Sequence, residues 1–330
     1  MSDEEIGFMS AAELMVHYER GRLSPVEVVA AVLRHIEATE PKINAMVEVT
    51  ARHAMDSARR AEAAYRAGVN RRLEGVPVTI KDLQETANIP TRYGSWSRKD
   101  NVPTVDAPCV TRLHEAGAVM LGKTTVPEFG WKGVSQSPLT GVTSNPWKAG
   151  YNAGASSAGA GAAAAAGYGP LHQGGDGAGS IRMPAHFCGV FGMKPTHGRI
   201  PNWPISNNDL ATHMGPLTRT VKDAALMLEA MSGPHPWDIP PLRPRRCPIR
   251  PCCPPRSKDA GLPTVPILAM PVSILMWLRP LRRRSVCLRA WAPRWRKLLR
   301  PGGRKGRNWR VFSGLPPIAQ NARSCRSGNR

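Results

Sequence analysis

Ser180 follows a stretch crowded with glycines, within GGDGAGSIRMPAHFCG at residues 174–189. A glycine cluster marks either a tight turn or a close approach of the backbone to another group. One interpretation is therefore a surface turn that joins two elements. The other is a nucleophilic serine whose neighbouring N–H groups converge on the negative charge that develops during a reaction.

Two further segments carry groups that could assist such a serine. Lys81 ends the apolar stretch VPVTIK, where a charged side chain is costly unless it is paired or neutral. The alternative is a lysine that reaches solvent from the end of a strand. Ser156 and Ser157 lie among small residues in NAGASSAGAG, which is either a site of close backbone packing or a flexible linker. The histidines of this region are scattered, so a serine hydrolase would need another base, and lysine is the candidate.

Other motifs are weaker. GAVMLGKT, residues 117–124, fits the pattern of a phosphate-binding loop, but its central residues predict a strand, and Pro127 follows where a helix should begin. The glycines near Ser180 do not fit the dinucleotide fingerprint, and neither serine cluster fits the nucleophile elbow of α/β-hydrolases. No His/Cys group within residues 1–236 has metal-ligand spacing, so we expect no metal and no cofactor.

The charge of the chain is concentrated at one end. Of its 330 residues and formal net charge of +21, residues 237–330 hold 22 of the 45 Lys and Arg but only two acidic residues. Residues 1–236 are nearly neutral, as an ordinary globular domain is. The N-terminus lacks the basic and apolar regions of a secretory signal, and no apolar run reaches the length of a membrane-spanning helix. These features predict a cytoplasmic protein without membrane insertion.

Helices and short strands alternate through the first part of the chain. Ser24, Pro25 and Glu27 form a capping box at the start of an apolar helical stripe, which we expect to end before Pro41. The patterns predict further helices at about 51–67, 107–116, 158–167 and 220–232, and strands at 75–82 and 118–122. This alternation indicates an α/β fold.

Three segments together resemble the amidase signature family. They are GVPVTIKD (75–82), GASSAG (154–159) and GGDGAGSIRMPAHFCGVFGMKPTHGR (174–199). The resemblance covers residues 1 to about 236. It implies a mixed central β-sheet surrounded by helices, incomplete at the C-terminus, with an amidase signature domain over 1–236 and a basic tail over 237–330.

The resemblance also implies the site residues. It makes Ser180 the nucleophile, Ser156 a bridging serine on a cis peptide, and Lys81 the terminal base. Ser157 and Asp176 would support the hydrogen-bond network. The oxyanion would be held by the backbone N–H groups of Gly177, Ala178, Gly179 and Ser180. Because alanine fits this loop only where φ is negative, we expect Ala178 to adopt such a conformation.

This mechanism requires a neutral lysine. Burial would have to lower the pKa of Lys81 from about 10.4 to near 7, which is within the range of buried lysines. Asp82 would oppose that change if it were close. Successive side chains of a strand point to opposite faces, so we expect Asp82 to lie away from the site.

The function implied is hydrolysis of a small-molecule carboxylic amide through a Ser-Ser-Lys triad and an acyl-enzyme. The alternatives are a glutaminase-type subunit of a transfer-RNA amidotransferase, and a truncated inactive remnant whose basic tail binds polyanions non-specifically. The resemblance allows a homodimer and gives no reason to expect specific nucleic-acid binding.

The family-like sequence stops abruptly near residue 240. Arg-, Pro-, Cys- and Trp-rich sequence without helix or strand periodicity follows. We interpret it as translated in a shifted reading frame, for which family-like sequence in a neighbouring frame of the coding DNA is the test. A basic extension with a role of its own is the alternative.

Overall fold

The computed structural model describes residues 1–205 and 211–237. Of the predicted tail, residues 237–330, only Trp237 falls within these ranges. The domain boundary at 236, the reading-frame interpretation and the polyanion-binding tail therefore concern residues outside the described part, and they stay predictions.

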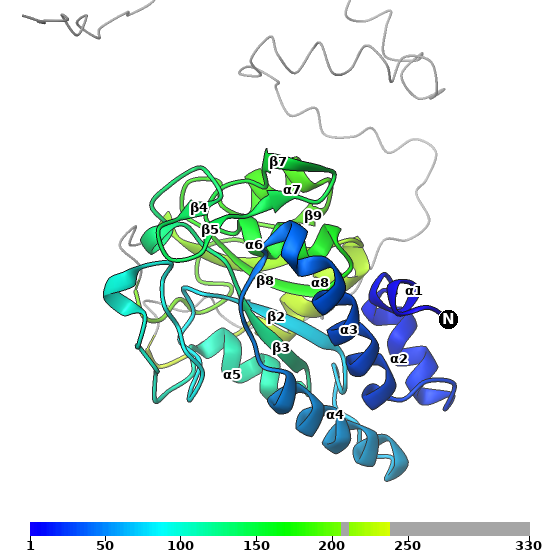
Figure 1. Cartoon of the computed structure of the whole chain (residues 1–330). Coiled ribbons are helices and arrows are strands. Elements are labelled where there is room, and N and C mark those ends of the chain that lie inside the picture. The colour runs from blue at the N-terminus through cyan, green and yellow to red at the C-terminus, as the bar shows by residue number, and fades with distance from the viewer. Residues whose placement is uncertain (206–210, 238–330) are drawn as a thin grey trace, which may run out of the picture. The chain divides into compact units, whose positions relative to one another are not determined.

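Eight α-helices and ten strands are defined within the described residues (Figure 1). The helices are α1 (Asp3–Gly7), α2 (Ala11–Glu19), α3 (Pro25–Ile43), α4 (Ala51–Arg66), α5 (Pro108–Glu115), α6 (Ala158–Ala165), α7 (Arg182–Cys188) and α8 (Val221–Met231). The strands are β1 (Met46–Val49), β2 (Pro77–Lys81), β3 (Val119–Thr124), β4 (Gln136–Ser137), β5 (Gly141–Val142), β6 (Ser144–Asn145), β7 (Lys148–Asn152), β8 (Leu171–Asp176), β9 (Phe191–Gly192) and β10 (His213–Thr218). Short 3₁₀ helices span Trp96–Arg98 and Glu128–Gly130.

A six-stranded mixed sheet forms the centre, in the order β1-β3-β2-β8-β10-β9. β2 runs parallel to β3 and β8, whereas β1, β10 and β9 are antiparallel to their neighbours. The ribbons β4–β5 and β6–β7 lie outside this sheet. Helices pack around it, as Figure 1 shows, and the predicted mixed α/β architecture is confirmed.

The two faces of the sheet pack against different helices. On β3, Val119 and Leu121 pack with α3, α4 and α6, whereas Met120 packs with α5 and α8. This is the alternation expected of a strand that is covered on both faces. Each face therefore has its own apolar core.

The same alternation on β2 positions the lysine. Val78 and Ile80 belong to the core with α5 and α8. Thr79 and Lys81 therefore face the opposite side, toward the start of α6. The carboxyl end of β2 thus delivers an amine to the face on which the two adjacent serines lie.

Most predicted elements are confirmed, and one boundary is wrong. The Ser24 capping box is present, but α3 passes Pro41 and ends only at Asn44. Pro41 lies in the last turn of the helix, and the end is set by Asn44, which adopts a left-handed conformation (φ 55°) with its N–H bonded to the Glu40 carbonyl. A left-handed cap stops the helix more effectively than the proline does.

Two elements around Ser180 were not anticipated from the sequence. LHQGGD forms the buried strand β8, although glycine is depleted in strands, and the residues after Ile181 form α7. The phosphate-loop-like segment 117–124 contains β3, so its prediction as a strand is confirmed.

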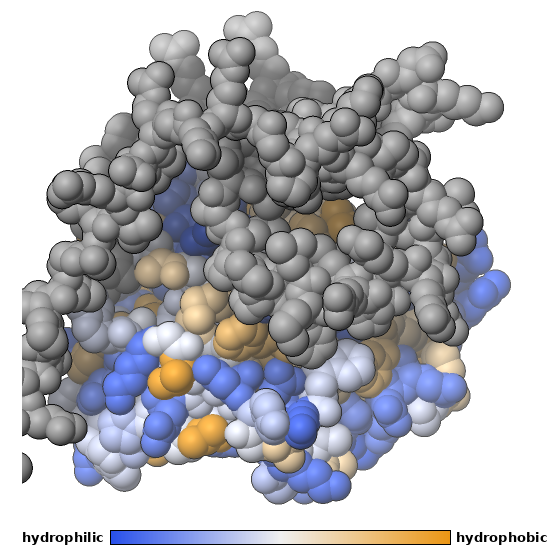
Figure 2. Space-filling view, turned by 90° about the horizontal axis from the view of Figure 1, so that it is seen from above, coloured by the Kyte–Doolittle hydropathy of each residue, from blue (hydrophilic) through white to orange (hydrophobic). Residues whose placement is uncertain are grey.

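The visible surface in Figure 2 carries hydrophobic side chains as separate patches among hydrophilic ones. Among residues 1–205 and 211–237, no helix combines the length and apolar character that crossing a membrane would require.

Candidate active site

Strand β8 and the loop after it present Ser180. Gly174 of this strand leaves no room for a side chain, because a Cβ there would lie 2.9 Å from Leu217 and 3.2 Å from Ser157 Oγ. Gly179 has φ +115°, a conformation that side chains rarely allow. Ala178 does not have a positive φ, as predicted for alanine at this position. The glycines before Ser180 therefore fit a crowded strand and one turn position.

Lys81 is fully buried between β8 and the serine-rich segment. Its Nζ lies 2.7 Å from Ser156 Oγ, 2.8 Å from Ser157 Oγ and 3.1 Å from the Gly175 carbonyl oxygen. The structure thus brings together the lysine and both serines that the sequence singled out. A solvent-reaching lysine and a flexible linker, the alternatives for these segments, do not describe this arrangement.

Burial lowers the pKa of Lys81 to about 7, and the nearby Asp176 carboxylate opposes the change. Asp82 lies away from the amine, as expected, and accepts hydrogen bonds from the Arg92 backbone N–H. A lysine with this pKa is half neutral at neutral pH and can accept a proton.

For the neutral form of Lys81, the hydrogen-bond directions can be assigned by counting donors. The Gly175 carbonyl can only accept, and Ser157 Oγ lies 3.1 Å from that carbonyl while receiving the Gly175 N–H at 3.2 Å. If the Ser157 proton points at the carbonyl, Ser157 accepts from Lys81. A neutral amine has two donors and one lone pair, so its remaining partner, Ser156, donates to the lone pair. Ser157 orients the amine, and Ser156 is in position to pass a proton to it.

The predicted cis peptide at Ser156 is not found. Within the described residues, the cis bond is Trp203–Pro204. A trans bond is favoured by about 3 kcal/mol or more for a residue other than proline, and the trans backbone already holds Ser156 Oγ against Lys81.

Ser180 opens into the same cavity as Lys81 and Ser156. The cavity has a volume of about 280 Å³, and the three side chains contribute to its lining together with Gly175 and Gly177. The Ser180 hydroxyl forms no hydrogen bond with any described residue, so the Ser180–Ser156 hydrogen bond of the expected relay is not formed in this structure. Catalytic hydrogen bonds commonly tighten only when substrate is bound.

Three of the four predicted oxyanion donors are available. The N–H groups of Gly177, Ala178 and Ser180 have no acceptor among the described residues. The Gly179 N–H instead donates to Asp176 Oδ1 at 2.7 Å, so the prediction for Gly179 does not match the structure. Gly179 also has a positive φ, and its N–H is engaged by this carboxylate.

Asp176 clamps the loop that carries Ser180. Its buried carboxylate accepts hydrogen bonds from the backbone N–H groups of Gly179, Ile181 and Arg182. It also accepts hydrogen bonds from Arg182 Nε at 2.9 Å and Nη2 at 3.0 Å, and one oxygen lies 3.3 Å from Lys194 Nζ. Burial alone would raise the pKa of Asp176, but the hydrogen bonds from Arg182 and the loop hold it well below the ordinary value.

Substituting Asp176→Asn is expected to reduce the free energy of unfolding by about 2–4 kcal/mol, because two cations lose their charged partner. The depressed pKa means that the carboxylate stabilises the fold above about pH 4, and that this stabilisation is lost as the pH falls. Urea unfolding of the purified chain at pH 7 measures the change. Asp56→Asn, which removes a surface ion pair with Arg59, is the matched control and should cost under about 0.5 kcal/mol. Equal losses in both variants would contradict the clamp.

No sequence pattern pointed to the aromatic and cationic side chains of the cavity. Tyr93, Phe129 and Arg98 line it, together with Gln84 and Ile205. They come from segments without helix or strand periodicity. Tyr93 and Phe129 both have positive φ, at 55° and 49°, which is rare for bulky residues and tends to occur at functional sites.

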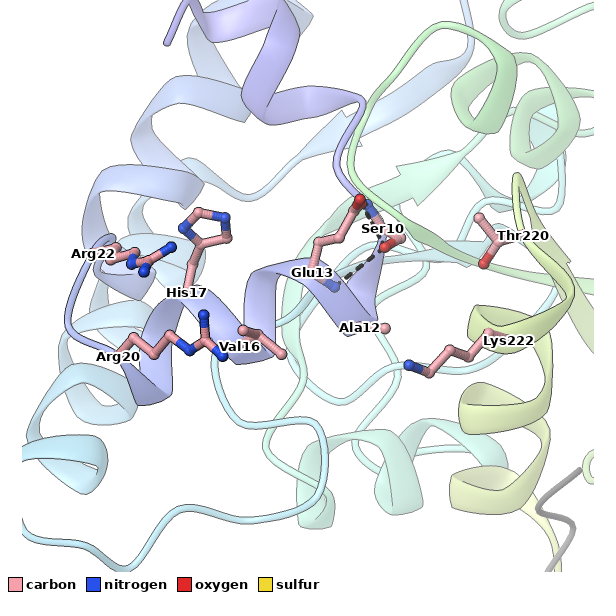
Figure 3. A pocket seen from close by; sticks show the side chains of 9 residues that line it. All are labelled: Ser10, Ala12, Glu13, Val16, His17, Arg20, Arg22, Thr220 and Lys222. Atoms are coloured by element: carbon pink, nitrogen blue, oxygen red, sulfur yellow. Dashed lines mark hydrogen bonds between the residues drawn. The ribbon is translucent and has the colours of Figure 1, made fainter.

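A second hollow, which shares no lining residue with the cavity at Ser180, lies between α2 and the start of α8 (Figure 3). His17, Arg20, Arg22 and Lys222 contribute to it. Its one serine, Ser10, is engaged with Glu13 in the N-terminal cap of α2. It offers no pairing of a serine with a buried lysine, so the cavity at Ser180 is the candidate active site.

The fold and this site together define a class: an α/β protein with a serine and a serine–lysine pair on one cavity. The model of the family described as Amidase matches residues 27–259. An acylamidase of Rhodococcus erythropolis is 45% identical over 240 residues, which is 71% of this chain and 50% of the relative. The chain belongs to the amidase family, whose members carry the amidase signature.

Other relatives within the family differ in their described roles. A glutamyl-tRNA(Gln) amidotransferase subunit of Solidesulfovibrio magneticus is 41% identical over 241 residues, covering 72% of this chain and 48% of the relative. The crystal structure of a bacterial aryl acylamidase of the amidase signature family superimposes with a TM-score of 0.68 at 32% identity, covering 72% of this chain and 50% of that chain. The chain thus spans about half the length of the curated relatives it matches.

Proposed function

We propose that this chain hydrolyses carboxylic amides, with Ser180 as nucleophile, Ser156 as proton relay and Lys81 as terminal base. The observation that carries the proposal is the contact between the buried Lys81 amine and Ser156 Oγ, on the cavity into which Ser180 opens. A weakly acidic serine needs a base, and this lysine has a pKa of about 7.

In the proposed reaction, each proton that leaves Ser180 passes along the relay and is returned to the leaving group. Ser180 Oγ forms a bond to the carbonyl carbon while its proton moves to Ser156 Oγ, and the Ser156 proton moves to the Lys81 lone pair. The N–H groups of Gly177, Ala178 and Ser180 donate to the resulting oxyanion. The proton then returns along the same relay to the leaving nitrogen as the C–N bond breaks. Water attacks the Ser180 ester in the same way and releases the carboxylate.

The reaction requires no metal or cofactor, because the lysine supplies the base and the backbone supplies the oxyanion donors. Ser157 and Asp176 act on other groups: Ser157 orients the amine, and Asp176 holds the loop. The cytoplasmic location and the homodimer stay predictions.

A glutaminase-type subunit is the second candidate. Its support is the 41% identity to the amidotransferase subunit of Solidesulfovibrio magneticus over most of the described residues. Such a protein would release ammonia from glutamine and co-purify with partner subunits, whereas a free amidase would act alone.

Labelling of Ser180 by a fluorophosphonate tests the proposal. The rate constant of labelling should rise about tenfold per pH unit below pH 7 and level off above it, because the relay needs neutral Lys81. In-gel fluorescence of the purified chain between pH 5 and 9, with peptide mapping by mass spectrometry, measures both rate and site. Folded protein without labelling at Ser180 would favour the inactive remnant.

A further inference from the structure

The described residues that line the cavity at Ser180 have an uneven charge. Among the described residues that line it, none is Asp or Glu, and the ionisable bases are Lys81 and Arg98. Lys81 must be neutral for the proposed reaction. Arg98 therefore provides the permanent charge of this lining, which is positive.

Arg98 has no carboxylate partner among the described residues. Other exposed arginines do: Arg34 pairs with Asp3, and Arg72 pairs with Glu229. The side-chain hydrogen bond of Arg98 is a long one, from Nη1 to Asn101 Oδ1 at 3.4 Å. Most donors of its guanidinium fork are consequently open to a ligand.

The guanidinium is held at the cavity by an aromatic wall. Its central carbon lies 5.9 Å from the centroid of the Tyr93 ring, within the range of a cation–π contact. The Tyr93 hydroxyl donates to the Glu85 carboxylate, and the Phe129 N–H donates to the Tyr93 carbonyl at 2.8 Å. The Tyr93 and Phe129 rings lie 6.2 Å apart. Tyr93, which packs against the guanidinium, is thus fixed by hydrogen bonds of both its side chain and its backbone.

We propose that Arg98 is a specificity-determining residue that binds a carboxylate of the substrate, so that the chain prefers amides bearing an anionic group. This inference rests on the proposed amide hydrolysis at Ser180. The planar fork of a guanidinium matches a carboxylate in a bidentate manner. Leu83, Phe129 and Ile205 supply apolar surface for the carbon chain between the carboxylate and the scissile amide. Amides that carry a cation would be repelled by the charge of Arg98 and should bind less well.

Two matched substrate pairs test the inference with the purified full chain. Glutaryl 4-nitroanilide and 5-methylhexanoyl 4-nitroanilide differ by a carboxylate in place of an isopropyl group on the acyl side. 4-Acetamidobenzoate and 4-isopropylacetanilide differ in the same way on the amine side. We expect a higher kcat/KM for the charged member of at least one pair. Arg98→Met should lower that value about 10- to 100-fold and leave the neutral member within about twofold.

The matched control is Arg22→Met, which removes an exposed arginine from the hollow shown in Figure 3. It should leave the ratio of kcat/KM between the charged and the neutral substrate unchanged in both pairs. Arg98→Lys should restore part of the preference, and Arg98→Glu should reverse it. Equal kcat/KM values within both pairs, or a preference that survives Arg98→Met, would overturn the role of Arg98 while neutral-amide hydrolysis still stands. If none of the four substrates is hydrolysed and Ser180 is not labelled, the proposed function is overturned, and this inference with it.

Discussion

Ser180→Ala is expected to abolish amide hydrolysis, lowering kcat by about 10⁴- to 10⁶-fold, because the acyl-enzyme can no longer form. The side chain opens into the cavity and forms no hydrogen bond with a described residue, so its removal should change the free energy of unfolding by less than about 1 kcal/mol. Hydrolysis of 4-nitroacetanilide followed by absorbance, together with urea unfolding, measures both quantities.

The control for Ser180 is Ser57, which lies on α4 and accepts a hydrogen bond from Arg60. Ser57→Ala should keep full activity and full labelling by the fluorophosphonate. Residual hydrolysis above a few per cent in Ser180→Ala would assign the nucleophile to another residue. The loss of folded structure in the variant would instead show that Ser180 serves the loop rather than the chemistry.

The sequence singled out the three side chains that we propose for catalysis, but it did not predict the strand that leads to one of them. Lys81 was a candidate because a lysine at the end of an apolar strand is costly unless it is neutral or paired, and the family resemblance implied its role. β8 could not be predicted, because its glycines are poor strand formers. Gly174 is needed there because Ser157 and Leu217 leave no room for a Cβ. That requirement comes from tertiary packing, which local propensity does not record.

Two details of the site were also beyond the sequence. The segment that carries Ala178 and Gly179 offers four backbone donors, and only the observed hydrogen bond from the Gly179 N–H shows that one of them is taken by Asp176. Tyr93 and Arg98 of the cavity wall come from a loop and a short 3₁₀ helix, and Tyr93 is fixed by a contact distant in sequence, the hydrogen bond from the Phe129 N–H to its carbonyl. Neither feature leaves a periodic pattern.

Lys81→Met is expected to lower kcat about 10²- to 10⁴-fold and to change how stability depends on pH. In the native state the pKa of Lys81 is about 7, against 10.5 for an exposed lysine. Between these values the unfolded chain binds one proton more than the native chain, so stability rises with pH, by about 5 kcal/mol over the whole window. Below pH 7 the full cost of burying the amine is present. Methionine has a similar length and no charge, and it removes this dependence.

Urea unfolding at pH 7 and pH 9.5 isolates the effect. The free energy of unfolding of the parent chain should increase by about 3 kcal/mol more than that of Lys81→Met over this interval. Lys123 is the matched control: it is equally buried, it lies on the neighbouring strand β3, and burial lowers its pKa to about 8. Its amine bonds to Gln84, Thr86 and Thr91 rather than to a serine of the cavity.

The two lysines therefore separate burial from catalysis. Lys123→Met should also flatten the rise of stability with pH, yet it should retain labelling at Ser180, whereas Lys81→Met should lose both. If Lys81→Met kept the pH-dependent gain, the amine would be charged in the native state and could not serve as the base. Because the relay acts as a unit, Lys81→Met combined with Ser180→Ala should cost no more activity than Ser180→Ala alone. A further loss in the double variant would mean that Lys81 acts on the substrate by a route that does not pass through Ser180.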